Sequence, residues 1–297
     1  MQRRSWILVI VIILLLLGIL GITTVGVIYA MFSGVREPIS GHNVAIVEIK
    51  GVILDSEPFT ERLDKLLEEK DIKAIVVRVD SPGGVVAPCQ EIYDAILEAR
   101  KKKHVITSMG AVGASGGYYI AVAGEKIFAL PGTLTGSIGV IMDFANLEQL
   151  YDWAKIEPYT LKSGQYKDIG STIRPMTEEE KAILQSTLSD IYQQFRKAVK
   201  DNRKIEDSVL DKITDGRIFS GSQAFQYGLV DELGGLQAAI NKAAEIANIK
   251  GKPKVLYPPE KRPTLFKLLT SMSDQMESVT TRLQSALFQG PMYIWGR

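Results

Sequence analysis

The sequence predicts an α/β fold with parallel strands, preceded by a helix that crosses a membrane. Two observations predict this architecture. Over residues 44–130, β-branched runs alternate with segments of helical periodicity, which is typical of layered α/β folds. Residues 5–35 carry no charged side chain, and a stretch of about 20 apolar residues is long enough to span a bilayer.

Each expected element follows from its own local pattern. Strands are expected at four short runs of apolar and β-branched residues: 44–49, 74–79, 105–108 and 126–130. Helices are expected at four segments with helical spacing or helix-start signals: 57–70, 89–103, 178–202 and 235–247. The third of these begins with a capping box, in which Thr177 is the N-cap and Glu180 lies three positions later. A loop carrying Ser115 and a short helix are expected after the third strand.

The N-terminal segment is expected to be an uncleaved, single-pass membrane anchor. Arg3 and Arg4 precede the apolar stretch, which favours a cytoplasmic N-terminus and a folded body outside the cytoplasm. Residues 29–33 match a signal-peptide cleavage site poorly. We therefore divide the chain into a stub with its anchor, a linker, an α/β domain and a tail, at residues 1–35, 36–43, 44–250 and 251–297.

Composition narrows the partners and the chemistry. The formal net charge is +1 and the folded part has no strongly basic stretch, which argues against a nucleic-acid partner. Cys89 is the one cysteine, so no intramolecular disulfide forms, and without an evident basic partner it is best interpreted as a packed thiol. We expect neither a cofactor nor a metal ion.

A glycine-rich run marks Ser115 as a candidate nucleophile. Residues 113–117, Gly-Ala-Ser-Gly-Gly, fit the Gly-x-Ser-x-Gly pattern that presents a serine at a turn between a strand and a helix. Hydrolases with that pattern take their histidine from a later position in the chain. Here His42 and His104 both precede Ser115, so we set a Ser-His-Asp triad aside.

A lysine can take the proton of the serine instead, provided that its amine is neutral. Residues 159–171 offer Lys162 and Lys167, and spacing alone does not choose between them. A second glycine-bearing loop, residues 80–84, follows the second strand. If the second and third strands are neighbours, the two loops meet at the carboxyl end of the sheet.

Four ordered motifs together resemble the bacterial signal peptide peptidase A family (peptidase family S49), in its short, single-repeat form. The motifs lie at residues 81–84, 108–121, 132–140 and 162–169. Asp80 and residues 110–113 differ from the residues most common in that family at these positions. None of them has an assigned chemical role. The resemblance covers roughly residues 44–248 and implies a ClpP/crotonase-like layered fold. It also implies a homo-oligomer, a ring such as an octamer, whose subunits share active sites.

The resemblance also implies a role for each site residue. Ser115 is expected to be the nucleophile, Lys167 the general base and Ser137 the residue that orients the lysine. The backbone amides of Gly84 and Gly116 are expected to form the oxyanion hole. The implied enzyme is a membrane-anchored Ser-Lys endopeptidase that degrades signal peptides and other apolar peptides. Its lysine comes either from the same subunit or from a neighbouring one, and for the short form we expect the neighbour.

Two other function classes fit parts of the same pattern. A crotonase-like acyl-CoA enzyme would share the fold and use backbone oxyanion donors without a serine nucleophile, but the anchor and Lys167 count against it. A catalytically silent membrane scaffold would use the fold only to oligomerise. The apolar chain end, residues 291–297, is expected to dock in a substrate groove of its own or a neighbouring chain, as an occupant or a self-processing site.

Overall fold

The computed structural model describes residues 16–26, 41–258 and 291–295. The chain divides into two compact units, residues 1–38 with 259–279 and residues 39–258 with 280–297. In the first unit the described residues, 16–26, are helical. Among the helices that the structure describes, none combines the length and apolarity needed to cross a membrane. The rest of the predicted anchor and most of the predicted linker lie outside the described residues.

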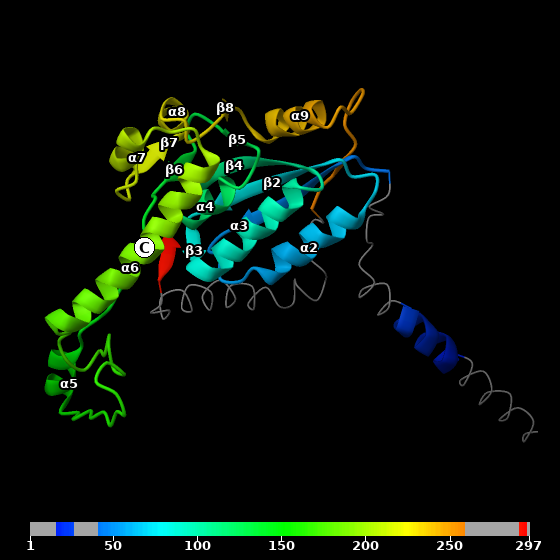
Figure 1. Ribbon diagram of the computed structural model, residues 1–297. Coiled ribbons are helices and arrows are strands. Elements are labelled where there is room, and N and C mark those ends of the chain that lie inside the picture. Colours follow the sequence, from blue (N-terminus) through cyan, green and yellow to red (C-terminus); the bar gives the residue numbers. More distant parts are fainter. Residues whose placement is uncertain (1–15, 27–40, 259–290, 296–297) are drawn as a thin grey trace, which may run out of the picture. The chain divides into compact units, whose positions relative to one another are not determined.

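A mainly parallel sheet forms the centre of the second unit (Figure 1). Its strands are β1 (Val44–Lys50), β2 (Ala74–Ser81), β4 (His104–Ala114), β5 (Lys126–Ala129), β6 (Leu134–Gly136), β7 (Ile218–Ser220), β8 (Glu232–Leu233) and β9 (Val255–Leu256). The main strand order is β7-β6-β4-β2-β1-β9, and β5 and β8 branch from β4. Because β1 and β2 are covered on both faces, their sequences are almost continuous runs of Val, Ile and Ala.

Helices cover both faces of this sheet (Figure 1). The helices on one face are α2 (Glu57–Glu68), α3 (Val86–Arg100) and α4 (Gly116–Ala121), and α9 (Leu236–Ile246) lies on the other. Alternate residues of β1 separate two apolar clusters: Val47 packs toward α2 and α3, whereas Ile46 packs toward Ile240 of α9. The predicted α/β class with parallel strands is therefore confirmed.

A long helix carries part of the chain away from the sheet. It is α6 (Glu178–Asn202), and it begins with the predicted capping box between Thr177 and Glu180. Phe195 and Val199, near its C-terminal end, are fully buried in the core. Its opposite end carries residues 142–177, which we call the arm and which include α5 (Glu148–Ala154) (Figure 1). The chain then returns to the sheet through α7 (Asp207–Ile213) and α8 (Gly221–Gln226).

The strand that leads to Ser115 is longer than the sequence predicts. The predicted strand ends at residue 108, but β4 continues to Ala114, so Ser115 follows the strand directly and not a loop. Residues 108–114 are mostly small and show no apolar alternation, which is why their pattern indicates a loop. They stay extended because β6 pairs with them and because Asp80 Oδ1 accepts the Val112 amide at 3.0 Å. Asp80, which differs from the residue most common in the resembled family, therefore makes a hydrogen bond that keeps β4 extended.

The predicted tail contributes two strands to the domain. β9 extends the sheet beside β1, beyond the expected domain end at residue 250. β10 (Met292–Ile294) pairs antiparallel with β3 (Gly83–Val85), in a separate two-stranded sheet. The chain end therefore lies against the glycine loop that follows β2.

Candidate active site

Ser115 lies in a strained turn between β4 and α4. Its backbone has φ 51° and ψ −118°, a conformation that a non-glycine residue adopts only where its surroundings impose it. Here the Ser115 amide donates to the Gly136 carbonyl at 2.8 Å, and its own carbonyl accepts the Tyr119 amide at 2.8 Å. The side chain is buried and makes no hydrogen bond with any residue that the structure describes. The predicted position ahead of a short helix is confirmed.

Ser137 is brought beside Ser115 by the pairing of β4 with β6. Ala114 is opposite Gly136 in the parallel register, so the residue that follows the end of each strand is one of the two serines. Ser137 also has φ 51°, and its amide donates to the Arg217 carbonyl at 2.8 Å. It lines a cavity of about 450 Å³ formed with residues 138–141, α6, residues 214–216 and Ile294 of β10. Within the described part of the chain, its hydroxyl has no hydrogen-bond partner.

Gly84 and Gly116 meet because β2 and β4 are neighbouring parallel strands, as the sequence predicts. A Cβ on Gly116 would lie 3.1 Å from the Gly84 amide nitrogen, and a Cβ on Gly84 would lie 1.9 Å from the Ile53 carbonyl oxygen. Neither position has room for a side chain. The Gly84 amide, one of the two predicted to form an oxyanion hole, therefore lies next to Gly116.

Cys89 is packed beneath this pair of glycines. Its side chain is completely buried, and its sulfur would lie 2.6 Å from a Cβ on Gly116. Burial raises the pKa of the Cys89 thiol well above its usual range, so the group stays neutral. The interpretation of Cys89 as a packed thiol is confirmed.

The C-terminal segment occupies the groove beside these residues as an extended strand. On one side Tyr293 is opposite Gly84 in the antiparallel pair of β10 with β3. On the other side Met292 and Ile141 exchange two backbone hydrogen bonds of 3.1 Å. The Trp295 amide also donates to the Pro82 carbonyl at 2.8 Å. Main-chain contacts therefore hold both edges of the segment, which is how an added peptide strand binds to a protein.

The Tyr293 carbonyl oxygen lies among the loop amides. It is 2.9 Å from the place of a Cβ on Gly116 and 1.8 Å from the place of a Cβ on Gly83, whose φ of +106° favours glycine. The Tyr293 ring is fully buried, stacks on Tyr119 at a centroid distance of 5.1 Å and lies 4.7 Å from Phe195. Its hydroxyl donates to a carbonyl of α6 at 3.1 Å. The groove thus holds an aromatic side chain, and the carbonyl of the same residue lies close to Gly83 and Gly116.

Neither candidate lysine contacts Ser115 or Ser137 within the described residues of one chain. Both belong to the arm, at the end of α6 remote from the sheet (Figure 1). Lys162 is held by the Asp168 carboxylate at 2.5 Å and by the Gln165 carbonyl at 2.8 Å. Lys167 is exposed, and its amine has no hydrogen bond or ion pair with any described residue. The structure therefore separates two lysines that spacing could not.

The histidines lie at the opposite end of the sheet from Ser115. His104 is the first residue of β4, and its Nδ1 is 3.1 Å from a Glu125 carboxylate oxygen. His42 precedes β1 at the same end of the parallel strands. No histidine of the chain is thus placed to activate Ser115, in agreement with the sequence interpretation.

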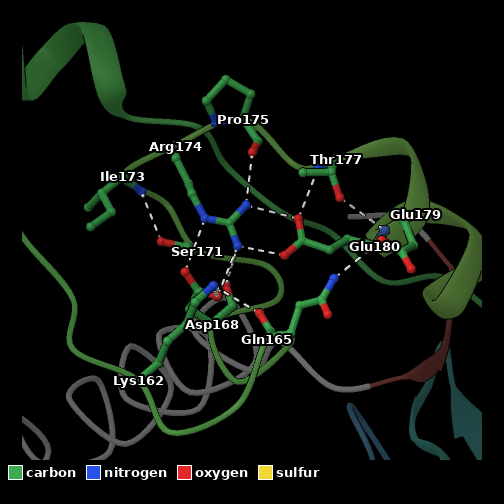
Figure 2. A network of polar contacts seen from close by, with 10 residues as sticks. All are labelled: Lys162, Gln165, Asp168, Ser171, Ile173, Arg174, Pro175, Thr177, Glu179 and Glu180. Atoms are coloured by element: carbon green, nitrogen blue, oxygen red, sulfur yellow. Dashed lines mark hydrogen bonds and ion pairs between the residues drawn. The ribbon is translucent and has the colours of Figure 1, made fainter.

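An ionic cluster in the arm was not anticipated as part of the site. Arg174 joins the Asp168 and Glu180 carboxylates, and Lys162 contacts the same aspartate (Figure 2). The Arg174 guanidinium, with Lys162, holds the pKa of Asp168 well below its usual range. Arg174 and the Thr177 amide lower the pKa of Glu180 to about 2. The capping box was visible in the sequence, but the fold of the arm that brings Asp168 to it was not.

Comparisons with known proteins agree with this geometry. Residues 97–250 match peptidase family S49 and residues 52–135 match Clp protease. A putative protease of Synechocystis sp. is 38% identical over 241 residues, which is 81% of this chain and 87% of that protein. A putative protease of Methanocaldococcus jannaschii is 36% identical over 72% of this chain and 69% of its own. A putative signal peptide peptidase SppA of Enterococcus faecium is 29% identical over 88% and 83%. The chain belongs to peptidase family S49.

Proposed function

We propose that this chain is a serine endopeptidase that cleaves extended apolar peptides, with Ser115 as nucleophile and Lys167 of a neighbouring subunit as general base. One observation carries the proposal furthest. The chain's own residues 292–294 lie as a strand between β3 and Ile141, with a carbonyl beside the amides of Gly84 and Gly116. An extended peptide substrate in the same place would present its scissile carbonyl next to Ser115.

The reaction follows from that placement. The Ser115 hydroxyl attacks the carbonyl carbon while a neutral lysine amine accepts its proton, and the amides of Gly84 and Gly116 bind the resulting oxyanion. The lysine then protonates the leaving amine, and the peptide remains as an ester on Ser115. A water molecule that is deprotonated by the same lysine hydrolyses the ester. Ser137, which lines the adjoining cavity, would hold the amine by a hydrogen bond.

Several features support a base from the neighbouring subunit. The arm carries Lys167 away from its own sheet, whereas the cavity beside Ser137 is lined by no residue of the arm. The arm also exposes large apolar side chains, each more than half accessible: Leu150, Trp153, Ile156, Tyr159 and Leu161. Exposed apolar groups gathered on one element are typical of a protein interface. A homo-oligomeric ring would cover them and deliver the lysine.

The N-terminal sequence supports a membrane location, and the name of one relative supports signal peptides as the substrate. Residues 5–35 are uncharged and long enough to anchor the protein in a membrane, after two arginines that favour a cytoplasmic N-terminus. The relative from Enterococcus faecium carries the name signal peptide peptidase. Signal peptides left in a membrane are apolar and extended when unfolded, which suits the groove that holds Tyr293. We therefore propose them as the substrate class.

Mixed oligomers test the nucleophile and the shared site together. Ser115→Ala and Lys167→Ala variants are each expected to lose peptide hydrolysis, whereas Lys162→Ala is expected to retain most of it. Co-assembled Ser115→Ala and Lys167→Ala subunits are expected to regain about a quarter of the activity, because random pairing in a ring combines the intact serine and lysine at that frequency. Cleavage by Ser115→Ala alone would contradict the nucleophile. Absence of any recovery would place the lysine in the same chain.

A further inference from the structure

We infer that Arg174 is a positioning residue for Lys167: it holds the carboxylates of Asp168 and Glu180 and thereby keeps the lysine amine free to act as a base. The inference rests on the proposed role of Lys167. It adds a residue that acts through that lysine and does not itself contact the substrate.

All three nitrogens of the Arg174 guanidinium donate hydrogen bonds (Figure 2). Its Nε donates to Asp168 Oδ2 at 3.0 Å, and its two terminal nitrogens donate to the two Glu180 carboxylate oxygens at 2.5 and 2.9 Å. One of these nitrogens also donates to the Pro175 carbonyl at 3.1 Å. A planar guanidinium is suited to such forked binding, because its donors have a fixed geometry that matches carboxylates. Asp168 and Glu180 are therefore both held on one side chain.

The second carboxylate, Glu180, fixes the cluster to the first turn of α6. Glu180 is almost fully buried, and its Oε2 also accepts the Thr177 amide at 2.9 Å as part of the capping box of α6. A buried carboxylate is stable only when it is paired and hydrogen-bonded. Arg174 consequently links the turn that contains Lys167 to the first turn of the long helix. The direction in which Lys167 projects depends on this link.

The charges around Lys167 are balanced by the same contacts. On the arm, Lys162 and Arg174 face Asp168, and on α6, Glu180 faces Arg174. Glu179 of α6 also faces this turn: it accepts hydrogen bonds from Gln165 and from Tyr166, whose pKa is raised by that contact. Asp168, the residue next to Lys167, thus has both of its carboxylate oxygens engaged by cations other than Lys167.

Removing Arg174 would leave the Asp168 and Glu180 carboxylates without their shared cation. Asp168 would keep Lys162 as a partner but would be free to turn toward the adjacent amine, and Glu180 would lose its cation. A carboxylate within about 4–6 Å favours the charged form of a lysine and raises its pKa. A general base must be neutral, so a higher pKa means that activity appears only at higher pH. The cluster would therefore determine both where the lysine projects and the pH at which it works.

The test is the pH dependence of kcat/KM for an apolar peptide, measured on the full chain. Arg174→Met is expected to move the acid limb of the profile upward by about one pH unit. Arg174→Lys keeps a cation, so its limb is expected to stay in place while kcat/KM falls. Adding Asp168→Asn to Arg174→Met removes the released carboxylate and is expected to bring the limb back toward the wild-type position.

A matched control removes an arginine that lies on α6 and not in the arm. Arg196 pairs with Asp211 far from the arm, and Arg196→Met is expected to leave the limb unmoved. Uniform loss of activity in Arg174→Met without a shifted limb would overturn the inference, because a merely structural clamp would do the same. An unchanged profile would overturn it as well. Retained activity in Lys167→Ala would instead contradict the proposed base, so the two failures are distinguishable.

Discussion

The carboxyl end of the sheet, which carries Ser115, and the arm, which carries Lys167, are built in different ways. At the end of the sheet the strained serine, the paired glycines and Ser137 are fixed by backbone hydrogen bonds between buried strands. In the arm, α5 has no buried residue, and the turn around Lys167 is held by backbone hydrogen bonds within the turn and by the ion pairs of Asp168 and Arg174. The nucleophile and the oxyanion donors therefore belong to the rigid core. The base lies on a surface element that can adjust to a neighbouring subunit.

The largest effect on kcat is expected from a substitution in the rigid core beside Ser115. In Gly116→Ala the new Cβ would meet the Cys89 sulfur at 2.6 Å and the bound carbonyl oxygen at 2.9 Å. Displacing one oxyanion donor typically lowers the rate by ~10²–10³. The control is Gly132→Ala, because a Cβ there meets nothing within 4 Å. Comparable kcat values for the two variants in peptide hydrolysis would show that the Gly116 amide does not stabilise the transition state.

Sequence reasoning succeeded for this rigid core because its signals are local. Val and Ile runs mark β1 and β2, and the motif around Ser115 indicates a turn between a strand and a helix. Because β2 and β4 are neighbouring parallel strands, the two glycine loops lie at the same carboxyl end of the sheet. The extension of β4 was missed because its small residues have no apolar alternation. It depends on β6 and on Asp80, which are distant in sequence.

The arm was less predictable because its contacts depend on tertiary folding. The capping box from Thr177 to Glu180 is a local pattern and was found. The link from Glu180 through Arg174 to Asp168 requires the arm to fold back on α6, and no spacing rule indicates that. The same holds for β10, whose predicted docking is observed, but whose register opposite Gly84 is set by the groove. Residue spacing likewise did not separate Lys167 from Lys162; the family resemblance assigned Lys167, and the contact of Lys162 with Asp168 appears only in the folded arm.

An intermediate effect on activity is expected when the C-terminal segment is removed, because a peptide substrate would compete with that segment for the groove. Removing residues 291–297 frees both edges of the groove, and kcat/KM for a short apolar peptide is expected to rise a few-fold. Tyr293→Ala should act in the same direction, because it empties the site between Tyr119 and Phe195. Removing residues 296–297 alone is the control and retains β10. If activity and oligomer stability both stay unchanged after the longer truncation, the segment does not occupy the groove in solution.

The smallest effect is expected from titrating the arm. The pKa of Glu180 falls from 4.5 to about 2 in the folded protein, since Arg174 and the Thr177 amide favour its charged form. Because the folded pKa is the lower one, the stabilisation is complete above pH 4.5 and is lost as the pH falls toward about 2. The protection of amides in the first turns of α6 against hydrogen exchange should therefore fall over this interval before it does in β4. Glu180→Gln should remove the dependence, and protection that falls equally in both elements would show that the arm and the sheet lose structure together.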